Sequence, residues 1–77
     1  MAESKPTIEL LMQRYYNDMY RLACSFLRDP AEADDAAQAA FIAAARGLET
    51  FEGRAEVRTW LYRITANTCL SLLRKRR

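Results

Sequence analysis

The chain has 77 residues, of which 51% are apolar, and it contains only two glycines and two prolines. This length corresponds to one domain near the lower limit for a core without staples, and the composition excludes a disordered tail. No apolar run is long enough to span a membrane, and the N-terminal residues lack the apolar segment of a signal peptide. We therefore expect a cytoplasmic globular domain that does not enter a membrane.

Residue types that serve catalysis and metal binding are scarce. The sequence has no histidine, no glycine-rich phosphate loop and no nucleophile beside a base, so we expect neither an enzyme nor a cofactor. Cys24 and Cys69 lie far apart and form no CxxC pattern, so no metal site is predicted. Both are interpreted as small buried apolar residues, with a structural disulfide as the alternative.

The net charge of +2 conceals an uneven distribution along the chain. Residues 54–77 carry seven basic groups and one acidic group, whereas residues 1–53 carry five basic and nine acidic groups. This division favours a basic surface for a polyanion and a separate surface for a different partner.

Residues 7–28 are predicted to form a long amphipathic helix with Thr7 as its N-cap. Apolar residues recur in it at spacings of three and four, which is typical of a helix that packs on a core. They are Ile8, Leu11, Met12, Tyr15, Met19, Leu22, Ala23, Phe26 and Leu27.

A second helix is predicted over residues 30–46. Asp29 supplies an acceptor at the N-cap, Pro30 occupies the first helical position and Glu32 the third, which together form a capping box. Gly47 supplies a C-terminal stop. One face is predicted to pack on the core: Ala33, Ala37, Ala40, Phe41, Ala44 and Leu48.

The other side of this helix carries Asp35, Gln38, Ile42 and Arg46. An exposed isoleucine beside polar groups is typical of a protein-contact patch. The alternative is that Asp34 and Asp35 only interact favourably with the helix dipole.

The segment Gly47–Glu56 is predicted to be a loop of about ten residues with a helical turn around Leu48–Phe51, because it contains two glycines. Phe51 is interpreted as anchored in the core.

A third helix is predicted over residues 56–76. Its apolar stripe consists of Val57, Trp60, Leu61, Ile64, Thr68 and Leu72. A second row holds Thr59, Arg63, Asn67, Arg74 and Arg77, interrupted only by Leu70. A hydroxyl, an amide and three guanidiniums in line suit phosphate oxygens and base edges, although a solvated basic face is the alternative. The prediction is a single all-α domain, a small three-helix bundle over residues 1–77.

Three segments are followed by a basic cluster at the end of the chain: Glu32–Ile42, Leu48–Gly53 and Thr59–Thr68. In this order and with these gaps, they resemble the second conserved region of bacterial sigma factors of the extracytoplasmic-function (ECF) group. The resemblance covers residues 8–77. It implies a small helical bundle that binds core RNA polymerase and helps recognise and melt the promoter during transcription initiation.

The resemblance implies a role for each of two surfaces. The Asp-x-x-Gln-x-x-Phe pattern places contact with the clamp helices of the polymerase β′ subunit on Asp35, Gln38 and Phe41, and Ile42 belongs to the same surface. The Trp-Leu-Tyr-Arg-Ile-x-x-Asn pattern implies binding to the single-stranded non-template strand of the minus-ten element. This role falls on Arg54 in the preceding loop, Arg63 and Asn67, with Arg74, Arg76 and Arg77 holding the DNA backbone.

Some positions depart from the family pattern. Ala36 replaces a bulky aliphatic residue and Ala39 replaces an acidic residue, which would alter the affinity for polymerase. Trp60 matches the family tryptophan, but its place on the apolar stripe predicts a core residue instead of a wedge in the DNA. The fourth-region domain, which in the family binds the minus thirty-five element, is not present in these 77 residues.

Two other classes of function fit part of the pattern. One is a helical protein-interaction adaptor that binds through Ile42, and the other is a generic helix-turn-helix duplex binder, which the long second loop disfavours. The sequence leaves open the promoter sequence and whether an anti-sigma factor binds the domain.

Overall fold

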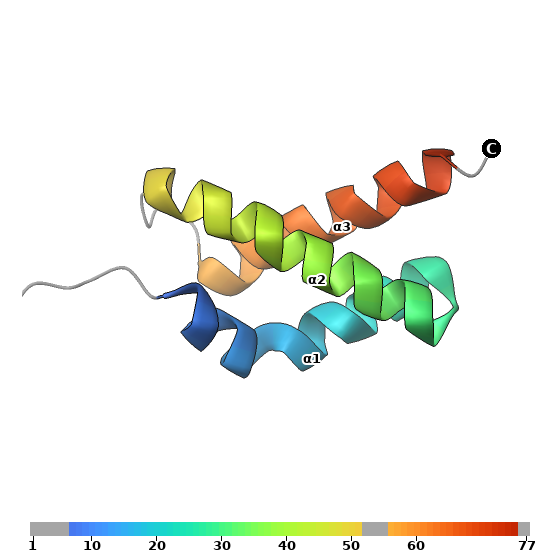
Figure 1. Ribbon diagram of the computed structural model, residues 1–77, viewed down its shortest axis with the longest axis horizontal. Coiled ribbons are helices and arrows are strands. Elements are labelled where there is room, and N and C mark those ends of the chain that lie inside the picture. The colour runs from blue at the N-terminus through green and yellow to red at the C-terminus, as the bar shows by residue number, and fades with distance from the viewer. Residues whose placement is uncertain (1–6, 52–55, 76–77) are drawn as a thin grey trace, which may run out of the picture.

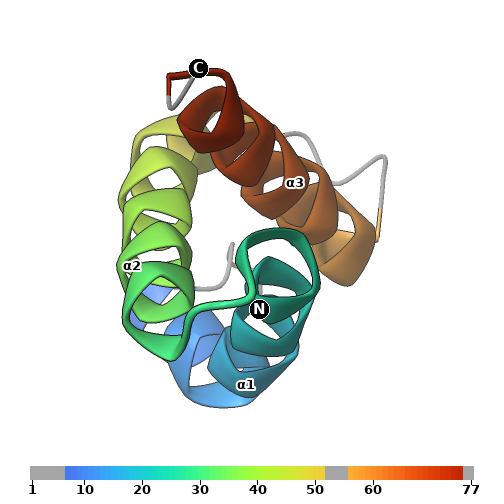
Figure 2. The same cartoon turned by 90° about the vertical axis from the view of Figure 1, so that its right-hand side faces the viewer.

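The computed structural model describes residues 7–51 and 56–75 of the chain. Its elements are α1 (Ile8–Leu27), α2 (Pro30–Gly47), the short 3-10 helix η1 (Leu48–Thr50) and α3 (Val57–Lys75). Each α-helix packs against the other two (Figure 1), and an end-on view shows them at the corners of a triangle (Figure 2). The predicted all-α three-helix bundle is confirmed.

Helix α1 begins and ends with local hydrogen bonds. The hydroxyl of Thr7 accepts the backbone N–H of Leu10 at 3.2 Å, as expected of an N-cap. At the other end Arg28 adopts the left-handed conformation, with φ of 62°, and its N–H donates to the carbonyl of Cys24 at 2.9 Å. This residue ends the helix and turns the chain directly into α2.

The predicted start of α2 is confirmed. Asp29 Oδ1 accepts the backbone N–H groups of Ala31 and Glu32 at 2.9 and 3.3 Å, and Pro30 is the first helical residue. These contacts satisfy two of the backbone donors that the N-terminus of α2 would otherwise leave without partners, and Pro30 has no N–H to satisfy.

Gly47 is the last residue of α2, but it does not adopt the conformation predicted for its cap. Its φ is −80°, so the left-handed cap conformation that favours glycine is not used here. A Cβ at this position would lie 3.3 Å from Cζ2 of Trp60, so the glycine permits close approach of the tryptophan ring. The chain then continues as η1, which confirms the predicted turn after residue 47.

The core consists of two clusters along the bundle. The first contains Leu11, Met19, Phe41, Ala44 and Leu61. The second contains Ala23, Leu27, Ala33, Ala36 and Cys69. Five alanines of α2 are 0 to 1% exposed, because their small side chains let α1 and α3 approach closely on either side: Ala33, Ala36, Ala37, Ala40 and Ala44. Ala36, treated above only as a departure from a family pattern, is one of these core residues.

The buried face of α3 differs from the predicted stripe. Its centre is Leu61, Thr65 and Cys69, while most of the predicted members are half-buried along its edges. Thr65 can be buried because its hydroxyl donates to the carbonyl of Leu61 at 2.9 Å, which satisfies the polar atom and leaves the methyl group for the core. Thr68, predicted for the stripe, makes the same bond to Ile64 but is only half-buried.

The two cysteines differ in burial. Cys69 is buried as predicted, and burial raises the pKa of its thiol. Cys24 is half-buried, so the prediction of burial is wrong for this residue, and both thiols are free instead of joined. Within the described residues, no helix combines the length and the apolar character needed to cross a membrane.

Candidate functional site

The polar row of α3 lies on the exposed side of the bundle. Thr59, Arg63, Asn67 and Arg74 are all exposed, and Leu70, which interrupts the row, is 43% exposed. Residues four apart on a helix rise by about 6 Å per step and stay on nearly the same side. The first three therefore present a hydroxyl, a guanidinium and an amide on successive turns.

The C-terminal part of the row is only partly described. Arg74 Nη2 donates to Ser71 Oγ at 3.4 Å, a long contact within the exposed last turn of α3. Lys75 is also exposed. Arg54, Arg76 and Arg77, predicted to contact DNA, lie outside the described residues.

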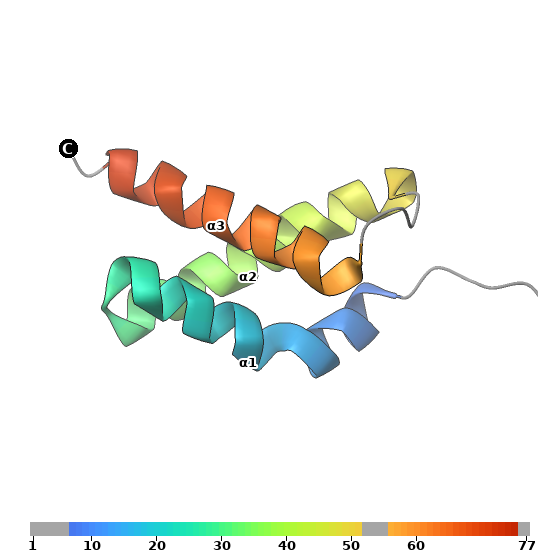
Figure 3. The ribbon, with the colours of Figure 1, turned by 180° about the vertical axis from the view of Figure 1, so that it is seen from behind.

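One basic residue of the third helix is engaged within the domain. Arg58 Nε lies 3.4 Å from Asp18 Oδ2 on α1, joining the two helices seen together in Figure 3. Its guanidinium also lies 5.1 Å from the ring centre of Tyr62, and Nη2 donates to the Tyr62 hydroxyl at 3.1 Å. The basic end of the chain therefore does not offer all its cations to a polyanion, which the charge count alone did not reveal.

Trp60 packs against the core of the bundle instead of lying along the polar row. It contacts the first core cluster, and its ring lies 4.6 Å from that of Phe51 with an angle of 32° between the planes. Both rings are half-buried. The geometry agrees with the interpretation of both aromatics as packing residues.

A groove of about 590 Å³ runs between α1 and α2. Ile42 is 59% exposed and Met12 37% exposed, so its rim is apolar. Phe41 is only 2% exposed and is therefore a core residue with an edge on the groove. The lining residues are Ile8, Met12, Tyr16, Asp34, Gln38, Phe41, Ile42 and Ala45.

A hydrogen-bonded network lies at one end of this groove. Gln38 Nε2 donates to Asp34 Oδ2 at 3.0 Å, and the hydroxyl of Tyr16 on α1 donates to the other carboxylate oxygen of Asp34. Desolvation by burial, followed by the hydrogen bond to Asp34, raises the pKa of Tyr16 to about 12. The phenol therefore stays protonated and remains a donor.

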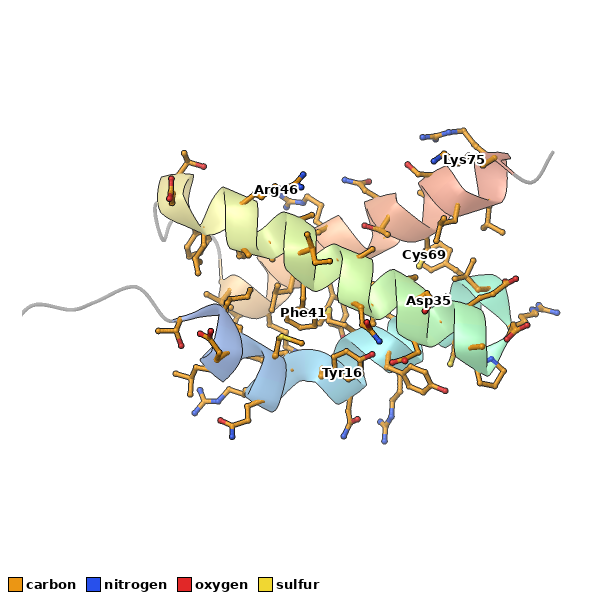
Figure 4. The ribbon with its side chains drawn as sticks, in the orientation of Figure 1. Tyr16, Asp35, Phe41, Arg46, Cys69 and Lys75 are labelled. Atoms are coloured by element: carbon orange, nitrogen blue, oxygen red, sulfur yellow. The ribbon has the colours of Figure 1, made fainter. Side chains whose placement is uncertain are left out.

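Asp35, and not Asp34, was predicted to share a surface with Gln38. Asp35 is exposed but lines a different hollow, next to Leu72 and Lys75 of α3. Figure 4 shows Tyr16 on α1 beside α2, and Lys75 at the C-terminal end of α3. Gln38, Phe41 and Ile42 thus line the same groove, whereas Asp35, although it is only three residues before Gln38 on α2, does not line it.

Comparison with known proteins identifies the family. Residues 11–77 match the protein family described as Sigma-70 region 2. The chain belongs to this family. Relatives of this sigma region 2 domain include the ECF RNA polymerase sigma factor SigM of Mycobacterium tuberculosis, which is 37% identical over 97% of this chain. The RNA polymerase sigma-H factor of Pseudomonas aeruginosa is 44% identical over 83% of this chain. SigW of Bacillus subtilis, also named an ECF RNA polymerase sigma factor, is 36% identical over 82%.

The sigma region 2 domain spans only part of each of these relatives. The matched part makes up 38%, 33% and 34% of the three proteins, respectively. No solved structure gives a significant match to the chain.

Proposed function

We propose that this domain acts in transcription initiation as region 2 of an ECF sigma factor. It docks on the clamp helices of the β′ subunit of core RNA polymerase and binds the single-stranded non-template strand of the minus-ten promoter element. The family match and the names of the relatives support the sigma-factor role. The division of the domain into two exposed surfaces of different chemistry supports the two contacts.

The exposed row on α3 is the observation that carries the DNA-binding part. The face of α3 that contains Leu61, Thr65 and Cys69 is buried, so the polar row cannot be part of the core. Arg63 supplies a charged donor to phosphate, whereas the amide of Asn67 can both donate to and accept from a base edge. One helix face therefore offers a contact for affinity and a contact for base identity.

Single-stranded DNA is the form that suits this face. A base edge that is paired in a duplex is reached only through a groove, whereas an unpaired base can turn towards a side-chain amide on a convex helix. Electrostatic attraction alone would favour duplex DNA, which has the denser array of phosphates. A preference for single strands would therefore reflect contacts to bases.

The surface of α2 next to the groove supports the second contact. Gln38 and the 59% exposed Ile42 lie together there, and the α2–α1 groove is separate from the polar row on α3. An apolar side chain flanked by a polar anchor is typical of a protein-protein contact. We assign this surface to the polymerase. Asp35 belongs to the contact if that contact extends to the N-terminal part of α2, where Asp35 lies near Leu72 and Lys75 of α3.

Selection from a random pool tests the DNA-binding part without knowledge of the promoter. The chain is expected to enrich a short sequence from single-stranded oligonucleotides, and fluorescence anisotropy should show tighter binding to the selected strand than to its duplex. Asn67→Ala should lower discrimination between selected and scrambled strands by about 1–3 kcal/mol. Arg74→Ala should weaken both strands alike and reduce the salt slope by about one.

Asn17→Ala and Arg14→Ala are matched controls, because both residues are exposed on α1. Neither should change affinity by more than a small amount. Tighter binding to duplex, together with unchanged discrimination in Asn67→Ala, would contradict the proposal and favour the generic duplex binder. Absence of any DNA binding would favour the protein-interaction adaptor.

A further inference from the structure

The side chain of Gln38 makes a hydrogen bond within the domain although it is exposed. Its Nε2 donates to Asp34 Oδ2 at 3.0 Å, one helical turn earlier on α2. An ionised carboxylate only accepts hydrogen bonds, so it requires the nitrogen and not the oxygen of the amide on its side. The amide oxygen of Gln38 is consequently turned away from the Asp34 carboxylate.

Asp34 is in turn fixed by a residue of another helix. The Tyr16 hydroxyl donates to Asp34 Oδ1 and also lies 3.3 Å from the Asp34 backbone carbonyl. The ring of Tyr16 is stacked on Phe41, with 5.9 Å between ring centres and 23° between planes. Because Phe41 is 2% exposed, the core fixes the ring of Tyr16 and, through it, the carboxylate of Asp34.

We propose that Tyr16 and Asp34 are positioning residues, which hold Gln38 with its amide oxygen outward so that α2 binds a hydrogen-bond donor on the polymerase. This inference rests on the proposed function. An arginine, lysine or amide side chain of the partner would supply the donor, and the exposed Ile42 beside it would cover the apolar part of the same side chain.

The network lowers the cost of binding because a long side chain is ordered before the partner arrives. Immobilising such a side chain on binding opposes association, and its loss of freedom corresponds to about a 3- to 10-fold change in affinity. Tyr16→Phe keeps the ring on Phe41 and removes only the hydroxyl. It should therefore weaken binding to core polymerase by about that factor while the side chains of Gln38 and Ile42 stay in place.

A double-mutant cycle tests whether Tyr16 acts through Gln38. Affinity for core RNA polymerase is measured for the wild-type chain, Tyr16→Phe, Gln38→Ala and the double variant. If Tyr16 only positions Gln38, Tyr16→Phe weakens binding in the wild-type background and has no further effect once Gln38 is alanine. Equal effects in both backgrounds would overturn the inference. Tyr15→Phe, which removes the same hydroxyl from a neighbouring half-buried residue, should leave affinity unchanged.

Side-chain amide relaxation by NMR provides a readout that needs no polymerase. The chain has two glutamines, and the exposed Gln13 is the reference for an amide that no described contact restrains. The Gln38 amide should be less mobile than that of Gln13 in the wild-type chain and equally mobile in Tyr16→Phe. Equal mobility in the wild-type chain would overturn the inference, whatever the partner.

The two readouts distinguish the inference from the proposed function. A restrained Gln38 in a chain that does not bind polymerase would contradict the docking function alone. Binding that Gln38→Ala weakens but Tyr16→Phe does not would contradict the positioning role alone. If Tyr16→Phe does not fold, Asp34→Ala removes the same support from within α2 and takes its place in the cycle.

Discussion

Replacing Trp60 by alanine should destabilise the domain and affect DNA binding only through folding. Loss of a buried Phe or Trp side chain typically costs about 3–5 kcal/mol. Trp60 is half-buried, its ring centre lies 4.6 Å from that of Phe51, and it packs on the first core cluster, so we expect the lower end, about 3 kcal/mol. For a domain of this size, with a total stability on the order of 5 kcal/mol, this is the larger part.

Urea denaturation followed by far-UV circular dichroism measures the effect, since the variant has no tryptophan to report by fluorescence. Leu70→Ala is the matched control on the same helix, because Leu70 is 43% exposed and should cost no more than about 0.5 kcal/mol. A Trp60→Ala variant that keeps the wild-type midpoint but loses single-stranded DNA binding would refute the reasoning. Trp60 would then belong to the nucleic-acid surface.

Two further predictions concern contacts that are seen in the structure and were not predicted from the sequence. Gly47→Ala should stabilise the Trp60→Ala variant by about 0.5–1 kcal/mol in urea melts, because alanine favours the helix. The same substitution should stabilise the wild-type chain less, because the new Cβ there would lie 3.3 Å from the tryptophan ring. Equal gains in both backgrounds would contradict the close approach. Stability should also fall as the pH rises from about 10 to about 12, because the pKa of Tyr16 is raised from 10.0 to about 12 in the folded state and the unfolded chain ionises first. Tyr16→Phe should make this fall smaller in denaturation curves measured across that range, and an unchanged fall would show that Tyr16 is not its source.

Local signals predicted the backbone well. The Asp29 and Pro30 pair placed the start of α2 correctly because a cap is decided by neighbours in sequence. The predicted helix ranges of 7–28 and 30–46 differ from α1 and α2 by no more than one residue at each end. The third helix was predicted to begin at residue 56, one residue before α3, and its predicted end at residue 76 lies outside the described residues. The alanine face of α2 was also predicted, since small residues at helical spacing can pack closely on either neighbour.

Side-chain contacts between helices were not predictable from periodicity. Thr65 and Thr68 of α3 both bond to the carbonyl four residues earlier, and only the position of α1 and α2 decides which of them is buried. The choice between Asp34 and Asp35 depends in the same way on Tyr16, which reaches α2 only after the helices pack. The spacing of four between Asp34 and Gln38 was the one signal in the sequence that could have suggested their contact.

The charge distribution along the sequence also did not show which basic residues are free to bind a partner. A count of basic residues treats Arg58 like Arg63, although Arg58 pairs with Asp18 of α1 and stacks on Tyr62. Arg63 is exposed on the polar row. The pairing depends on the α1–α3 contact, so the net charge at the C-terminal end indicated a polyanion-binding surface without showing which cations form it.

Binding of a selected single-stranded oligonucleotide to core RNA polymerase, with and without this chain, tests the central claim most directly. The account predicts that the chain associates with core polymerase and that the complex binds the selected strand more tightly than a scrambled strand, while core polymerase alone binds the two alike. This gain in discrimination should be lost with Asn67→Ala, which removes the contact to the base. It should be reduced with Gln38→Ala, which weakens the association of the chain with polymerase. A chain that does not associate with polymerase, or that associates without adding discrimination between the strands, would contradict the account.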